Sequence, residues 1–151
     1  IVSPSYKCNM TDIQAAIGLV QLDRYSGLLA RRRQIIEKYD AAFIPEGLLT
    51  VPHFTDRHTS SGHLYLLRIP GIDAERRNEI IVQMAEHGIA TNVHYKPLPM
   101  MTAYKNMGFD IKDYPNAYHQ YENEITLPLN TKLSDEDVDY IIENLLEILH
   151  G

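Results

Sequence analysis

The sequence predicts an α+β domain in which a small, partly antiparallel sheet packs against helices. Apolar residues recur at helical spacing in long segments near both ends of the chain. Between them lie short apolar segments that are bounded by proline and glycine, a pattern typical of strands. Two of these strands follow one another without an intervening helix, which favours antiparallel pairing.

Length, charge and cysteine content restrict the class of protein. The chain has 151 residues, enough for one domain, and its 14 basic and 20 acidic residues give a net charge of −6. This balance argues against a broad nucleic-acid surface. We expect neither a membrane span, which needs about 18 apolar residues, nor a signal peptide. The single cysteine, Cys8, excludes an intrachain disulfide and fits a cytoplasmic location. Because the first residue is Ile1, we expect a processed chain or a piece of a longer protein.

The first helical segment covers residues 11–45, as one helix or a helix pair. Thr11 and Gln14 form the pattern of a capping box at its start. Gly27 is expected to bend or divide the segment, and Pro45 to end it. We interpret the arginines at positions 31–33 as a solvated helix face rather than a phosphate site.

The remaining elements are bounded by cap residues, glycines and prolines. Strands are expected at residues 48–51, 64–69, 89–93 and 125–127. Helices are expected at residues 74–87, 100–105 and 117–121, and in a final segment after Ser134. Asp73 and Ser134 are suitable N-caps for the two longer helices.

Two short segments are candidate sites on chemical grounds. His94 and Tyr95 follow an expected strand and precede a proline-rich loop, so they either line a site or satisfy a capped turn. Tyr6, Lys7 and Asn9 precede a helix N-terminus, where anions bind, but chemistry alone favours a plain entry loop with Lys7 in solvent. The spacing of the histidines at positions 53, 58 and 63 does not match a metal site, and none is expected.

Four segments of the chain combine into one ordered pattern. The most specific is SYKCNMTDIQAAIG at residues 5–18. It is followed by HLY at residues 63–65 and by GI at 88–89 with HYKPL at 94–98. The last is ITLPL at residues 125–129, followed by Leu133 and Ser134. In this order, and covering nearly the whole chain, the segments resemble the DegT/DnrJ/EryC1/StrS family of sugar aminotransferases that depend on pyridoxal phosphate (PLP).

The resemblance implies that residues 1–151 are the C-terminal small domain of a fold type I aminotransferase. Residues 1–10 would lie near the cofactor site, and residues 11–45 would form the interdomain helix. A preceding N-terminal domain would carry the lysine that forms a Schiff base with PLP. The implied reaction moves an amino group from glutamate to a keto group of a nucleotide-linked sugar. The implied assembly is a homodimer, and the implied pathway makes polysaccharide or deoxyamino sugars.

The same resemblance assigns roles to individual residues. Asn9 and Lys7 would contact the cofactor, in a segment that reaches toward the PLP phosphate of the neighbouring subunit. The expected substrate-binding residues are His94, Tyr95, His63 and Tyr6. The chain would contain no catalytic residue, because the Schiff-base lysine lies outside it. Members often have glycine and an aromatic residue at the positions of Ser5 and Cys8, and a histidine where this chain has Pro99.

Two other functions remain open at this level. A dehydratase branch of the same family uses the same fold and PLP, with the Schiff-base lysine replaced. Alternatively, the domain is a non-catalytic binding or dimerisation module. An exposed apolar patch would favour a domain that another domain covers. In either aminotransferase or dehydratase, the isolated chain is expected to be inactive.

Overall fold

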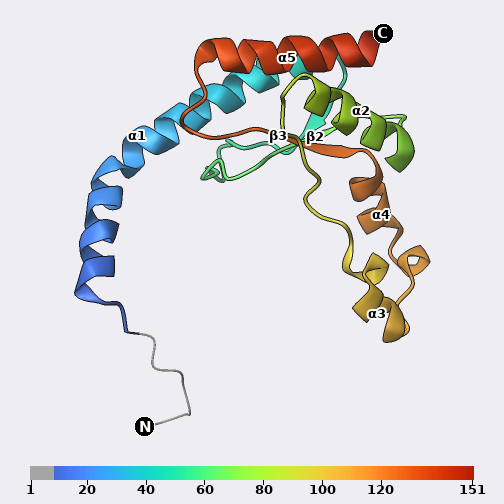
Figure 1. Ribbon diagram of the computed structural model, residues 1–151, viewed down its shortest axis with the longest axis horizontal. Helices are drawn as coiled ribbons and strands as arrows, with labels where there is room; N and C mark the ends of the chain where they lie inside the picture. Colours follow the sequence, from blue (N-terminus) through green and yellow to red (C-terminus); the bar gives the residue numbers. More distant parts are fainter. Residues whose placement is uncertain (1–8) are drawn as a thin grey trace.

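The computed structural model describes residues 9–151 and has an α+β fold (Figure 1). Its sheet has three antiparallel strands in the order β1-β2-β3: β1 is Leu49–Thr50, β2 is Tyr65–Arg68 and β3 is Glu124–Leu127. In β2 and β3, Leu66 pairs with Thr126 and Leu67 with Ile125. The expected fold class and the antiparallel pairing are therefore confirmed.

Helix α1, Asp12–Phe43, is one continuous helix whose first half bends away from the body of the domain (Figure 1). The predicted capping box is present: Gln14 N donates to Thr11 Oγ1, and Thr11 N donates to Gln14 Oε1. A Ser-Gly pair at residues 26–27 lies in the first half, and such pairs are common where helices bend. The helix ends just before Pro45, as expected.

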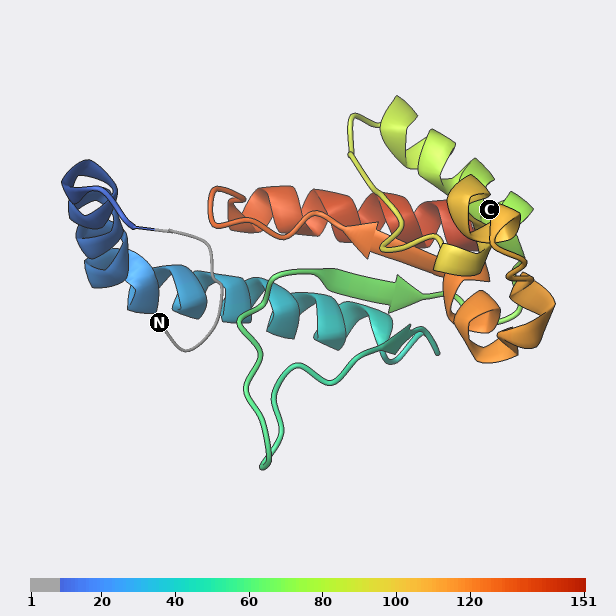
Figure 2. The ribbon, with the colours of Figure 1, turned by 90° about the horizontal axis from the view of Figure 1, so that it is seen from below.

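The other long helices are α2, Ala74–Glu86, and α5, Asp135–His150. Asp73 caps α2 by accepting from the main-chain N–H groups of Glu75 and Arg76. Ser134 caps α5 and accepts from Asp137 N. Figure 2 shows the second half of α1 lying alongside α5, with the strands next to them. Both predicted N-caps are therefore in place.

The core forms where the second half of α1, α5 and α2 meet the sheet. Its members are apolar side chains that are almost fully shielded from solvent. They include Ile35, Ile36, Tyr39 and Phe43 of α1, Tyr65, Leu67, Ile125 and Leu127 of the sheet, Ile80 and Met84 of α2, and Val138, Ile141 and Leu145 of α5. This burial is the main stabilising contribution to the fold.

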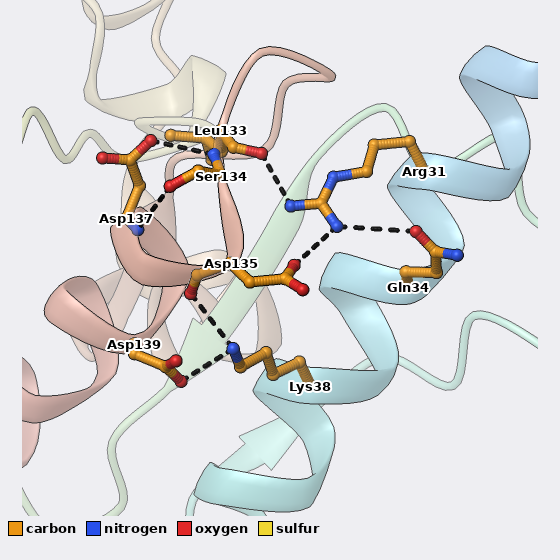
Figure 3. Close-up of polar contacts among 8 residues, drawn as sticks. All are labelled: Arg31, Gln34, Lys38, Leu133, Ser134, Asp135, Asp137 and Asp139. Carbon is orange, nitrogen blue, oxygen red and sulfur yellow. Dashed lines mark hydrogen bonds and ion pairs between the residues drawn. The ribbon is translucent and has the colours of Figure 1, made fainter.

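A set of polar contacts joins α1 to the start of α5 (Figure 3). Arg31 donates to Asp135 Oδ1 at 2.7 Å and to the Leu133 carbonyl at 2.6 Å. Lys38 Nζ lies 2.8 Å from Asp139 Oδ1. Arg32 donates to the Gly62 carbonyl at 3.0 Å. The interpretation of these arginines as a solvated face is therefore wrong for Arg31 and Arg32, which hold loops against the helix.

Short helical segments connect α2 to β3 and extend away from the sheet (Figure 1). They are the 3₁₀ turns η1, Leu98–Met100, and η2, Ile111–Asp113, and the helices α3, Thr102–Asn106, and α4, Pro115–Glu122. The two helices correspond to those expected near residues 100–105 and 117–121.

The prediction of a strand at residues 89–93 is wrong. Only Asn92 forms a bridge, to Thr126 on the free edge of β3. Asn92 N donates to the Thr126 carbonyl at 3.2 Å, and Thr126 N donates to the Asn92 carbonyl at 2.8 Å. The pairing does not continue beyond this bridge. The N–H of His94, two residues further along, would be the next to pair with the β3 main chain, but it donates to the Glu124 side chain instead.

Candidate functional site

His94 is the best positioned of the predicted site residues. The Asn92–Thr126 bridge places its loop against the outer edge of β3. From there, His94 N donates to Glu124 Oε2 at 2.9 Å, and His94 Nδ1 lies 2.9 Å from Thr126 Oγ1. The main chain and the imidazole of His94 are therefore both hydrogen-bonded to side chains of β3.

Glu124 and Thr126 are joined to each other as well. They are two residues apart on β3, which puts their side chains on the same face of the sheet. Thr126 Oγ1 donates to Glu124 Oε1 at 2.5 Å, and the two residues are 5% and 1% exposed, respectively. His94, Glu124 and Thr126 thus form a closed ring of three hydrogen bonds.

Glu124 is a buried carboxyl group whose ionisation the surroundings both oppose and support. Burial raises its pKa, whereas the hydrogen bonds from Thr126 and His94 N and the charges of His94 and Arg77 act against that rise. Arg77, which is 1% exposed, reaches the Glu124 main-chain carbonyl at 3.1 Å. Sequence reasoning missed Glu124 and Thr126 as neighbours of His94. A glutamate inside an otherwise apolar strand segment was the signal that could have found them.

Tyr95 and His63 do not belong to this ring of hydrogen bonds. Tyr95 is 72% exposed and meets the His94 ring edge-on, with 4.6 Å between ring centroids. His63 is exposed and lies two residues before the start of β2. Because β3 lies between β2 and the His94 loop, the described residues show no hydrogen bond or ring contact between His63 and His94.

Of the predicted cofactor segment, only Asn9 belongs to the described residues. It is exposed, lies two residues before the N-cap of α1, and makes no hydrogen bond within residues 9–151. Its carboxamide is thus available as a donor to an anion, and this fits the phosphate of PLP. Lys7 and Tyr6 lie outside the described residues, as does Cys8.

The first half of α1 carries an exposed apolar surface. It consists of large side chains that are 48–75% exposed. They are Ile13, Ile17, Leu19, Val20, Leu22 and Tyr25. Scattered exposed apolar residues are ordinary, but a run along one half-helix is typical of a surface that another domain or subunit covers.

Other features give no competing site. Within residues 9–151, no three His, Cys, Asp or Glu side chains gather as a metal ion would require, and no helix is long and apolar enough to cross a membrane. A surface hollow of about 760 Å³ is lined by residues of η2 and α4 such as Lys112 and His119. None of its lining residues is among the predicted site residues.

Comparison with known proteins identifies relatives over the whole chain. SpsC of Bacillus subtilis (strain 168), a spore coat polysaccharide biosynthesis protein, is 40% identical across 100% of this chain, which covers 40% of SpsC. Spr1654 from Streptococcus pneumoniae, which carries the name of a sugar aminotransferase, is 57% identical across 99% of this chain and 38% of its own. The TM-score is 0.92 for its PLP-form and 0.93 for its PMP-form.

The chain therefore spans about two fifths of the length of these relatives. PseC of Helicobacter pylori, an aminotransferase involved in pseudoaminic acid biosynthesis, is also similar in structure, with a TM-score of 0.78 at 27% identity over 99% of this chain and 40% of its own. The family model described as the DegT/DnrJ/EryC1/StrS aminotransferase family matches residues 2–146. This match covers nearly all of the sequence, and the chain belongs to the DegT/DnrJ/EryC1/StrS aminotransferase family.

Proposed function

We propose that this chain is the C-terminal domain of a PLP-dependent aminotransferase that moves an amino group from glutamate to a keto group of a nucleotide-linked sugar. The match to the aminotransferase family over residues 2–146 carries the proposal. The PLP- and PMP-forms of Spr1654 support it, because transamination cycles the cofactor between these two forms. The name of SpsC favours a product used in polysaccharide synthesis.

The exposed surface of α1 supports the presence of a second domain. Ile13, Ile17 and Leu22 would be covered by an N-terminal domain of the same polypeptide, which would also carry the cofactor lysine. The same surface fits a homodimer in which both domains meet the neighbouring subunit. The proposed location is the cytoplasm, where the single cysteine of the chain would stay reduced.

Within this arrangement the chain contributes binding groups. Asn9 and Lys7 would donate to the phosphate of PLP, which supplies the electron sink of the reaction when it is bound. His94 and Tyr95 would bind the sugar, and His63 and Tyr6 would line the same substrate region. The β3 side chains hold His94 in place before substrate arrives, so that little ordering cost remains for the complex.

The test uses the protein expressed together with the coding sequence upstream of Ile1. We expect bound PLP with visible absorbance that borohydride fixes to the protein, and glutamate-dependent amination of a keto sugar nucleotide. PLP that binds without being trapped would favour the dehydratase branch. No PLP binding at all would contradict the proposal and favour a non-catalytic module. The chain of 151 residues alone is expected to show no turnover.

Two variants of that longer protein test the assigned residues. Asn9→Ala should raise the Kd for PLP, and an unchanged Kd would remove the cofactor assignment. His94→Ala should mainly raise the KM for the sugar substrate and leave the Kd for PLP unchanged. His87→Ala is the matched control, because His87 is an exposed histidine at the end of α2 that makes no side-chain contact with the proposed site.

A further inference from the structure

The ring of hydrogen bonds formed by His94, Glu124 and Thr126 contains one hydroxyl proton, that of Thr126. The position of this proton decides which tautomer His94 adopts. Thr126 Oγ1 lies 2.5 Å from Glu124 Oε1 and 2.9 Å from His94 Nδ1. A hydroxyl group donates only one hydrogen bond, while its oxygen accepts others. Thr126 therefore cannot donate to both Glu124 and His94.

An ionised Glu124 resolves this choice. Both carboxylate oxygens then only accept: Oε2 accepts from His94 N at 2.9 Å, and Oε1 accepts from Thr126. Because the Thr126 proton is used toward Glu124, the Thr126 oxygen must accept from His94. The proton of the neutral imidazole consequently lies on Nδ1, and Nε2 carries a lone pair.

We propose that Glu124 and Thr126 are positioning residues that hold neutral His94 in the Nδ1–H tautomer, so that Nε2 accepts a hydrogen bond from a hydroxyl group of the sugar substrate. The substrate part of this inference rests on the proposed function; the tautomer part does not. His94 is partly exposed, and Nε2 makes no hydrogen bond within the described residues. An acceptor at Nε2 selects a group that carries a proton and disfavours keto and phosphate oxygens, which only accept.

The donors and the positive charge around Glu124 favour an ionised carboxyl group. Arg77 of α2 donates to its main-chain carbonyl at 3.1 Å, and Arg68 of β2 is its cross-strand partner. His94 is the remaining titratable group in contact with it. Burial raises the pKa of Glu124, while the hydrogen bonds from Thr126 and from His94 N and the charge of Arg77 oppose that rise.

The substitution Glu124→Gln should reverse the tautomer of His94. The His94 N–H needs an acceptor, so the carboxamide oxygen would face His94 and its NH₂ group would face Thr126. Thr126 would then accept from Gln and donate its own proton to His94 Nδ1. This places the imidazole proton on Nε2, the opposite tautomer. Thr126→Ser keeps the hydroxyl group and should leave the tautomer unchanged.

The experiment is ¹⁵N NMR of the histidine side chains in the ¹⁵N-labelled chain at pH 8, with the His94 signals assigned through His94→Gln. In the unsubstituted protein, and with Thr126→Ser, we expect a pyrrole-like Nδ1 and a pyridine-like Nε2. In Glu124→Gln, the two chemical shifts should exchange these ranges. An Nε2–H tautomer in the unsubstituted protein would overturn the inference, and this result does not depend on whether Glu124→Gln or Thr126→Ser folds.

The outcome is separable from that of the proposed function. If the tautomer is as expected but His94→Ala leaves the sugar KM unchanged in the longer protein, the substrate assignment fails and the tautomer inference stands. If His94→Ala raises the KM but the tautomer is Nε2–H, the inference fails and the proposed function stands.

Discussion

Arg31 Nη1 lies 2.7 Å from Asp135 Oδ1 and thereby links the middle of α1 to the first turn of α5 (Figure 3). The second guanidinium nitrogen donates to the Leu133 carbonyl at 2.6 Å, in a partly buried position. One planar side chain thus satisfies a loop carbonyl and a carboxylate at once, a geometry that lysine does not reproduce.

Arg31→Ala should lower the free energy of unfolding by about 1–2 kcal/mol, because the Leu133 carbonyl loses a hydrogen bond to a charged donor. Urea unfolding measures this value. Arg24→Ala is the control, since Arg24 is exposed on the same helix and makes no hydrogen bond or ion pair with the described residues. Equal stabilities of the two variants would contradict the prediction.

The ion pair adds a dependence on pH. The hydrogen bond and charge of Arg31 hold the pKa of Asp135 below its usual value. A lowered carboxyl pKa stabilises the fold above about pH 4 and loses this contribution as pH falls through the lowered value. The difference in stability between the unsubstituted protein and Arg31→Ala should therefore shrink below about pH 4.

Two tyrosines should resist ionisation. Tyr39 and Tyr65 are fully buried, and their hydroxyl groups donate to the Pro128 carbonyl at 2.9 Å and to Asp40 at 2.8 Å. Burial raises the pKa of both groups, and the Asp40 contacts raise that of Tyr65 further. Their protonated forms stabilise the fold fully below about pH 10, and this contribution falls as pH rises toward the raised values.

Absorbance titration of the phenolate band checks this expectation. Of the 10 tyrosines in the chain, two should ionise only together with the loss of far-ultraviolet circular dichroism. In Tyr65→Phe, one late group should disappear. If all tyrosines titrate smoothly before the protein unfolds, the buried hydrogen bonds are not formed in solution.

Much of the fold is local in origin and was therefore predictable. The caps at Thr11, Asp73 and Ser134 were recognisable because their partners lie within three residues in sequence. The segment at 89–93 has the composition of a strand, but its pairing depends on a side chain of β3 some 30 residues away. Sequence periodicity contains no information about such a contact.

The candidate site also has residues that the sequence predicts and residues that only a tertiary contact brings together. His94 and Tyr95 were found from a resemblance and from their place before a proline-rich loop. Glu124 and Thr126 became neighbours of His94 only through the Asn92–Thr126 bridge, which is a tertiary contact. The roles of Asn9, Lys7, Tyr6 and His63 stay predictions.

His53 should make the protein sensitive to mild acid. It is 8% exposed, stacks on Tyr65 at 5.8 Å between ring centroids, and its Nε2 is buried without a partner among the described residues. Burial lowers the pKa of His53, and the charge of Asp40 opposes this in part. A lowered histidine pKa stabilises the fold above about pH 6.5 and loses that contribution as pH falls through the lowered value.

When the pH falls from about 7 to about 5, the free energy of unfolding should therefore decrease less in His53→Gln than in the unsubstituted protein. Urea midpoints at the two pH values measure the difference. His87→Gln, at an exposed histidine, should keep the original pH dependence. If His53→Gln and His87→Gln lose the same amount, protonation of His53 does not destabilise the fold.

Arg77 anchors the start of β3, the strand that carries the His94 partners Glu124 and Thr126. It is 1% exposed, and its Nη1 donates to the carbonyls of Tyr121 at 2.9 Å and Glu124 at 3.1 Å. Its guanidinium also lies 4.7 Å from the centroid of the Tyr121 ring. Arg77→Met keeps much of the volume but removes the donor to one buried and one partly buried carbonyl, so it should cost about 2–4 kcal/mol in urea unfolding. Arg57→Met, at an exposed loop position, is the control and should cost little. A cost near zero at Arg77 would mean that solvent reaches both carbonyls, and β3 would then hold Glu124 without help from α2.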